Sequence, residues 1–317
     1  MNRMSKKKNQ ELDYIDYHDP DVQREVLERQ RRDLWTPEQI DSFAKHFKLK
    51  QGMRLLDAGC GWAYSLRKYG RYCMPGGKLV GLDRETVLFK RARELTGDEG
   101  LINATSFING DIFAMPFDSN SFDISIAQIV LCHLNQPEQA LDELIRVTKS
   151  GGCIAIFDNA SRGGHGSGWD NIFKPTMEQR LFFDEMRLMS MMAKKKLRNG
   201  DWSIGCYIPL WMSERGLKNI NVRQNEKVHW IAPPYDSPDQ QTDLRNMKER
   251  RSDKKYSAVW IRRGAENLRA LGVDEKRIER YIRALKRRRR LTYKALDEGR
   301  IAIASSHSFW CIWGFKP

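Results

Sequence analysis

The chain has 317 residues, 40% of them hydrophobic, which is enough to bury the core of one large domain with a sizeable insertion. No apolar run approaches the ~20 residues that cross a bilayer, and no apolar stretch follows the basic start at 1–8, so we expect neither a membrane span nor a secretory signal. The six cysteines form no C-x-x-C pair, which predicts reduced thiols in a cytoplasmic protein and no metal site.

The positive charge is concentrated in one segment. The chain carries a formal net charge of +14, and 241–300 alone holds 20 Lys and Arg against 9 Asp and Glu, an excess of +11. Any electrostatic attraction for a partner should therefore come from this segment. The five consecutive basic residues at 286–290 would point all around a helix, at about 100° each, which favours a solvated helix over a single binding face.

The region 1–50 carries helix signals and is predicted to form a helical cap. Asp19 and Pro20 can start one helix. A second start follows at 36–39, where a Thr cap residue precedes a proline in the first turn and an acid. The apolar residues that would then face inward are Ile40, Phe43 and Phe47.

Between 53 and 158 short apolar strands alternate with helical stretches. Such alternation is typical of a parallel sheet with helices on both faces. The predicted strands are 53–57, 78–83, 106–111, 122–128 and 153–158.

Two helical insertions interrupt this alternation. The first, 160–205, contains a methionine-rich helix from about Thr176 to Lys196, and the second, 235–300, is the basic segment. Strands at 219–230 and 305–315 are expected to pair as an antiparallel edge of the sheet. The prediction is an α/β fold with a seven-stranded, mostly parallel, doubly wound sheet. Its domains would be a core over 51–234 with 301–317, and a substrate lid over 235–300.

The strongest local signal is a strand that runs into a glycine turn and then a helix, at Leu55-Leu56-Asp57-Ala58-Gly59-Cys60-Gly61-Trp62-Ala63. Glycines allow a sharp turn and a close approach of the backbone to a ligand. The helix that follows directs free N–H groups toward that ligand. In open α/β sheets ligands bind at the carboxyl ends of the strands, where this turn lies.

This stretch resembles the first motif of class I S-adenosylmethionine-dependent methyltransferases, D/E-x-G-x-G-x-G, with Ala63 in place of the last glycine. The NAD fingerprint G-x-G-x-x-G fits worse, because Tyr64 stands at its third glycine. The resemblance implies a Rossmann-like fold and S-adenosylmethionine as cofactor. It implies cofactor contacts from Asp57, Gly59, Cys60 and Gly61.

Further landmarks of the same family follow in the family's order. Asp83 ends the second strand, where the resemblance implies a carboxylate on the ribose hydroxyls, next to Arg84. The turn at Asp111 and Ile112 resembles the adenine contact, with a plain turn role for Asp111 as the alternative. Gln128 ends the fourth strand, where it either lines the cofactor pocket or only closes the strand. Segments 144–152 and 211–217 resemble the R-V-L-K-P-G-G stretch and the helix before the sixth strand. The pattern is most similar to small-molecule methyltransferases of the quinone-biosynthesis type.

Two residues are candidates for catalysis. His133 follows the fourth strand, where a base near the reacting methyl group would stand, and Asp158 follows the fifth. For His133 a packing or capping role stays open, and for Asp158 a polar contact to the substrate is the role considered.

The predicted function is transfer of a methyl group from S-adenosylmethionine to an O, N or C atom of a small organic acceptor, with an anionic acceptor as one option. One alternative is an RNA methyltransferase that holds phosphates with 241–300, although no RNA-binding module is recognisable. Another is a non-catalytic binding protein built on the cofactor fold. The oligomeric state and the acceptor do not follow from the sequence.

Overall fold

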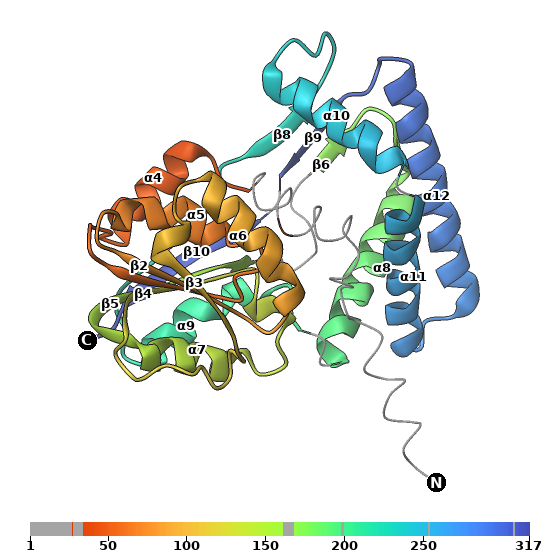
Figure 1. Ribbon diagram of the computed structural model, residues 1–317. Coiled ribbons are helices and arrows are strands. Elements are labelled where there is room, and N and C mark those ends of the chain that lie inside the picture. The colour runs from red at the N-terminus through yellow and green to blue at the C-terminus, as the bar shows by residue number, and fades with distance from the viewer. Residues whose placement is uncertain (1–26, 28–33, 161–167, 198–199, 253, 307) are drawn as a thin grey trace. The chain divides into compact units, whose positions relative to one another are not determined.

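The computed structural model describes residues 27, 34–160, 168–197, 200–252, 254–306 and 308–317 (Figure 1). These residues form two compact units, which are treated separately below. The sheet unit holds 27, 34–160, 200–227 and 308–317, and the helical unit holds 168–197 and 228–306 without residue 253.

The sheet unit contains a seven-stranded sheet in the order β3-β2-β1-β4-β5-β10-β7. The first five strands in this order run parallel, and β10 is antiparallel to both β5 and β7. The strands are β1 (Arg54–Ala58), β2 (Lys78–Asp83), β3 (Thr105–Asn109), β4 (Phe122–Gln128), β5 (Thr148–Asn159), β7 (Lys218–Gln224) and β10 (Phe309–Phe315). The predicted α/β fold with a mostly parallel, doubly wound sheet is confirmed.

Helices flank this sheet between its strands. They are α4 (Pro37–His46), α5 (Tyr64–Gly70), α6 (Phe89–Asp98), α7 (Pro137–Val147) and α9 (Ile208–Glu214). Short 3-10 turns lie at Arg71–Cys73, Thr86–Leu88, Ile102–Ala104, Leu131–His133 and Ile204–Cys206. The order of the strands reverses between β1 and β4, which is where ligands bind in open sheets of this kind.

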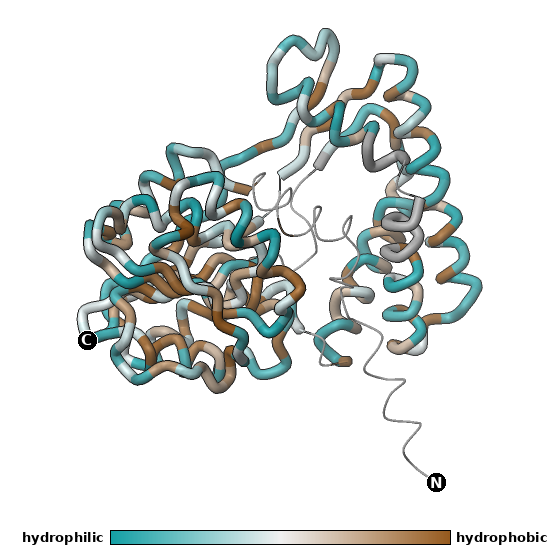
Figure 2. The backbone as a smooth tube through the Cα atoms, viewed as in Figure 1, coloured by the Kyte–Doolittle hydropathy of each residue, from teal (hydrophilic) through white to brown (hydrophobic). Residues whose placement is uncertain are grey.

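The core of the sheet unit is built on its central strands, which are buried on both faces and therefore apolar. Most residues of β1, β4 and β5 are buried, and Figure 2 shows hydrophobic stretches gathered in the middle of this unit. Helix α4 begins where the sequence predicted, since the Thr36 hydroxyl accepts a hydrogen bond from Gln39 N at 3.2 Å. Phe43 packs edge-on to Phe157 of β5, so α4 adds aromatic surface to this core.

The helical unit combines four helices and a small antiparallel sheet in the order β6-β9-β8. Its elements are β6 (Gly168–Asp170), α8 (Met177–Lys196), β8 (Val228–Ile231), α10 (Pro238–Ser252), α11 (Lys254–Ala270), α12 (Glu275–Asp297) and β9 (Ile303–Ser306). The predicted methionine-rich helix is α8, and it begins with a capping box between Thr176 and Gln179. None of the described helices is long and apolar enough to cross a bilayer.

Helix α8 belongs to the same unit as the basic helices, whereas the predicted domain boundaries had divided them between core and lid. Met186 of α8 is fully buried in one cluster with Leu268 of α11 and Ile278 of α12. An amphipathic helix needs a partner for its apolar face, and α8 has that partner in α11 and α12.

The expectation of two continuous strands at 219–230 and 305–315 was wrong in part. Residues 218–224 and 309–315 do pair in the seven-stranded sheet. The flanking residues form β8 and β9 instead, which pair with each other and with β6. Each predicted strand therefore divides into two strands. The first half of one and the second half of the other, β7 and β10, lie in the seven-stranded sheet, and the remaining halves, β8 and β9, lie in the small sheet.

Candidate cofactor site

The glycine loop lies between β1 and α5, at the carboxyl end of the first strand. Gly59 and Gly61 have φ values of +76° and +51°, which favour glycine. Both Gly59 N and Cys60 N donate to Leu82 O of β2, at 2.7 and 3.0 Å. Ala63 also adopts the left-handed conformation, with φ +60°. The backbone at the family's third glycine position is therefore left-handed here too, a conformation that glycine adopts without strain.

The loop also packs too closely against its neighbours to admit a side chain at Gly59. A Cβ on Gly59 would lie 2.6 Å from Val130 Cγ2, in the turn that follows β4. The loop therefore approaches its neighbour more closely than any side chain allows. Because Gly59 and Gly61 have no side chains, a ligand at this loop would contact its backbone.

Asp83, the last residue of β2, is tied to this loop. Its Oδ2 accepts a hydrogen bond from Gly61 N at 2.8 Å, and its Oδ1 accepts one from Glu85 N at 3.0 Å. A carboxylate accepts about four hydrogen bonds, so these contacts are compatible with ribose hydroxyls as further donors. Asp83 is half-buried, which strengthens hydrogen bonds to its charge.

Two further residues of the motif are buried. Asp57 in β1 is 2% exposed. The Cys60 side chain packs on β2, because a Cβ on Gly81 would lie 2.8 Å from Cys60 Sγ. Cys60 would accordingly contribute its backbone, and not its thiol, to a ligand in the loop.

The predicted adenine turn follows β3 and is linked to the end of β2. Gly110 N donates to Asp83 O at 3.2 Å, and Phe113 N donates to Asp111 Oδ1 at 2.9 Å. Asp111 is exposed and Ile112 is buried, so the turn presents one carboxylate and one apolar side chain. The Arg84 side chain is 71% exposed, and its Nε lies 3.4 Å from Glu85 Oε1.

Gln128 ends β4 next to the glycine loop's helix. The Gln128 side chain is 3% exposed, and its Oε1 accepts a hydrogen bond from the Ser65 hydroxyl of α5 at 2.9 Å. This contact joins α5, the helix that follows β1, to β4, and the strand order reverses between β1 and β4.

His133 lies in the 3-10 turn Leu131–His133 after β4 and is half-buried. Its ring packs edge-on to Trp202, with ring centres 6.1 Å apart. Asp201 N donates to Cys132 O at 3.0 Å, so the segment that carries Trp202 is fixed to the same turn. His133 and Trp202 thus form a wall at the carboxyl end of β4.

Asp158, the other catalytic candidate, is hydrogen-bonded to the backbone of this turn. It is completely buried, and its carboxylate accepts hydrogen bonds from Cys132 N at 3.0 Å and from Asn159 N at 2.8 Å. Burial raises the pKa of Asp158 to about 6, although the hydrogen bonds oppose the rise. The contacts of Asp158 make it a positioning residue for the turn that carries His133.

The structure brings most of the predicted residues together along one edge of the sheet: the loop at 59–61, Asp83, the turn at 111–112, and Gln128. Ser65 and Val130 contact two of these residues, Gln128 and Gly59, and were not predicted. No local signal marks either residue, because each is defined by a contact with a distant part of the chain: Ser65 and Gln128 are separated by 63 positions, and Val130 and Gly59 by 71. The catalytic roles of His133 and Asp158 stay predictions.

S-adenosylmethionine fits the residues present. The Asp83 carboxylate suits the ribose diol, and Ile112 offers an apolar contact for adenine. A further buried donor lies at the same edge: Asn159 Nδ2 has no hydrogen-bond partner among the described residues. Buried polar groups normally have partners, so this one favours a polar ligand at the strand ends.

Comparison with known proteins agrees with this geometry. Residues 56–156 match the methyltransferase domain family. Cycloartenol-C-24-methyltransferase 1 of Oryza sativa subsp. japonica is 32% identical over 110 residues, which cover 35% of this chain and 31% of that protein. An uncharacterized methyltransferase of Schizosaccharomyces pombe is 38% identical over 124 residues, covering 38% of this chain and 44% of that protein.

The chain thus spans less than half the length of either relative. Among solved structures, a SAM-dependent methyltransferase from Aquifex aeolicus has a TM-score of 0.44 and 22% identity, over 65% of this chain and 91% of that one. The sheet order, the glycine loop and the match over 56–156 identify this part of the chain as a methyltransferase domain of the class I, Rossmann-like type that uses S-adenosylmethionine.

Proposed function

We propose that this protein transfers the methyl group of S-adenosylmethionine to a small organic acceptor. The observation that carries the proposal is the hydrogen bond between Gly61 N and Asp83 Oδ2, which joins the glycine loop to a carboxylate suited to a ribose. When bound, the cofactor supplies a methyl group that is already activated by the sulfonium charge. The protein then has mainly to align the acceptor and exclude water.

The residues of the chain divide this work. The loop at 59–61 and Asp83 would hold the cofactor, and Ile112 would cover its adenine. His133 would take a proton from an acceptor hydroxyl or amine, since an imidazole exchanges protons near neutral pH. Asp158 would keep His133 in place through the backbone of the 131–133 turn.

The names of the relatives guide the choice of acceptor. Several of them act on sterols at C-24, among them sterol 24-C-methyltransferases of Gibberella zeae and Aspergillus fumigatus. An apolar small molecule is therefore the first acceptor class to test, with transfer to O, N or C left open. The cytoplasmic location remains a prediction.

RNA is a weaker candidate, because many basic groups of the helical unit already have acidic partners. Arg277 pairs with Glu185 at 2.6 Å, and Arg280 pairs with Glu178 at 3.1 Å. Cations that are neutralised within the unit contribute less to holding phosphates. The role of 235–300 as a substrate lid stays a prediction.

Cofactor binding tests the proposal directly. Asp83→Asn should raise the Kd for S-adenosylmethionine by roughly 5- to 150-fold, because the ribose hydroxyls lose a charged acceptor worth about 1–3 kcal/mol. Asp98→Asn, an exposed residue at the end of α6, is the matched control and should leave the Kd unchanged. Calorimetry measures both.

Two results would count against the proposal. Equal affinity in Asp83→Asn and the parent chain would remove Asp83 from the site. No binding of S-adenosylmethionine by the parent chain would leave only the non-catalytic binding protein. With binding established, transfer of labelled methyl groups to a sterol panel or to RNA distinguishes the two acceptor classes.

A further inference from the structure

The basic run at 286–290 lies in α12, and the fold gives its members different environments. Lys286, Arg287 and Arg290 are exposed. Arg288 is neutralised, because its guanidinium pairs with Asp170 Oδ2 at 2.7 Å and that carboxylate is only 9% exposed. Arg289 is half-buried, and its guanidinium lies 5.4 Å from the ring centre of Tyr293.

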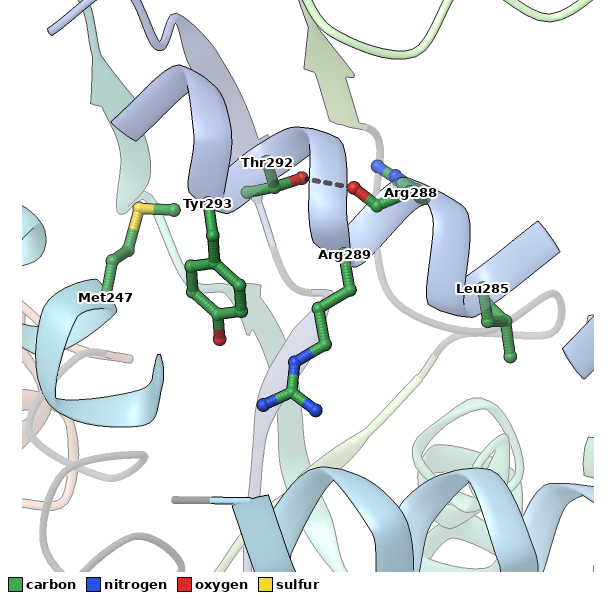
Figure 3. A pocket seen from close by; sticks show the side chains of 6 residues that line it. All are labelled: Met247, Leu285, Arg288, Arg289, Thr292 and Tyr293. Carbon is green, nitrogen blue, oxygen red and sulfur yellow. Dashed lines mark hydrogen bonds between the residues drawn. The ribbon is translucent and has the colours of Figure 1, made fainter. Parts of the chain in front are cut away.

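Arg289 borders a hollow within the helical unit. The hollow has a volume of about 310 Å³, at the small end of the ~300–1,000 Å³ typical of small-molecule sites. Arg289 and Tyr293 extend from α12 into this space, and Met247 reaches toward Tyr293 from α10 (Figure 3). The residues that line it are Met247, Leu285, Arg288, Arg289, Thr292 and Tyr293.

The lining combines apolar walls with one guanidinium, that of Arg289, which has no acidic partner in the described part of the chain. Met247, Leu285 and the Tyr293 ring offer apolar surface, and the Thr292 hydroxyl donates a hydrogen bond to Arg288 O at 3.0 Å. Among the residues whose side chains the structure describes, no carboxylate lines the hollow and none forms an ion pair with Arg289. A partly buried guanidinium without an anion bears a desolvation cost that a bound anion would offset.

The chemistry of Arg289 defines the group that would bind. Its planar guanidinium presents N–H donors in a fork that matches the oxygens of a phosphate or a carboxylate. Lys286, Arg287 and Arg290 of the same helix are exposed, and their positive charges add to the attraction. The apolar walls would cover a hydrocarbon part attached to that anion.

We propose that this hollow is a binding site for a small amphipathic anion, a phosphate monoester or carboxylate on an apolar body, with Arg289 holding the anion. A polyanion such as RNA would instead contact the exposed face of α12 that carries Lys286, Arg287 and Arg290. The site does not depend on methyl transfer, because it is defined by the helical unit alone.

Titration of the full chain with hexyl phosphate, hexanoate and inorganic phosphate tests the proposal. Hexyl phosphate or hexanoate should bind at least tenfold more tightly than inorganic phosphate, because only they fill the apolar part. The stronger of the two identifies the preferred anion. Arg289→Gln should weaken this binding at least tenfold, and Met247→Glu, on the opposite wall, should weaken it similarly.

Arg287→Gln is the matched control, since it removes the same charge from the exposed face of the same helix and should change the Kd less than twofold. The proposal is overturned if Arg287→Gln and Arg289→Gln weaken binding equally, if inorganic phosphate binds as tightly as hexyl phosphate, or if neither amphiphile binds at millimolar concentration. The Kd for S-adenosylmethionine should be the same in the parent and in Arg289→Gln. A chain that binds hexyl phosphate but no S-adenosylmethionine would refute only the methyltransferase function.

Discussion

Replacing Asp158 by asparagine should remove a pH dependence from the stability of the protein. Asp158 is completely buried beneath the 131–133 turn, and burial raises its pKa to about 6 from the ordinary value of 3.8. A raised pKa means that the folded state binds the proton more tightly than the unfolded state. The asparagine side chain has nearly the same shape as the aspartate and carries no charge at any pH.

The magnitude follows from the two pKa values. At ~1.36 kcal/mol per pH unit, a rise from 3.8 to about 6 corresponds to about 3 kcal/mol. This stabilisation is fully present below pH ~4, where the acid is neutral in both states, and is lost as the pH rises through ~6. Between pH 4 and 7.5 the parent chain should therefore lose about 2–3 kcal/mol of unfolding free energy relative to Asp158→Asn.

Urea unfolding of both chains at intervals from pH 4 to 7.5 measures this difference. Asp123→Asn is the control of opposite sign: burial raises the pKa of Asp123, but hydrogen bonds from Arg54 N and Lys149 outweigh it and keep the pKa below its ordinary value. Its difference from the parent should stay nearly constant over this range. A constant difference for Asp158→Asn as well would refute the assignment of a buried, proton-binding carboxyl.

Two further changes test the geometry of the sheet unit. Gly59→Ala should destabilise the protein by about 1–3 kcal/mol, because its φ is +76° and a Cβ there would lie 2.6 Å from Val130 Cγ2. Adding Val130→Ala to the same chain should recover part of this loss in thermal unfolding. Strictly additive effects of the two substitutions would contradict the contact. Cys206 should be the first of the six thiols to react with iodoacetamide in the native protein, because it is half-buried and the other five are buried. Burial also raises the pKa values of Cys153 and Cys311, which slows their reaction further. Mass spectrometry that finds Cys153 labelled first would contradict its burial in the core.

Several elements could be predicted from sequence because their causes are local. The glycine loop at 59–61 follows from a strand, two glycines and a helix start within one short stretch, and torsion angles depend on the residue itself. Helices α4 and α8 begin at Thr36 and Thr176 because a hydroxyl caps a backbone N–H three residues away. Asp83 was found for a related reason, since a strand's last residue lies at the edge where ligands bind.

Other features depend on contacts that the chain makes only after folding. The split of 219–230 into β7 and β8 required knowledge of which strands each half pairs with, and hydropathy is the same in either sheet. Likewise the contact of Asp158 with Cys132 spans 26 residues, and its pKa depends on burial that no sequence pattern reports.

Local sequence thus determined the type of fold, the cofactor loop and the starts of the main helices, since periodicity, caps and glycine torsions act over a few residues. Tertiary structure alone decided the roles of individual charges. Arg288 and Arg289 are neighbours of the same type, yet one is neutralised by Asp170, 118 residues away, and the other borders the hollow without an acidic partner among the described residues. Whether a charge is compensated depends on which distant groups the packed chain brings to it, and on how much water it excludes around them.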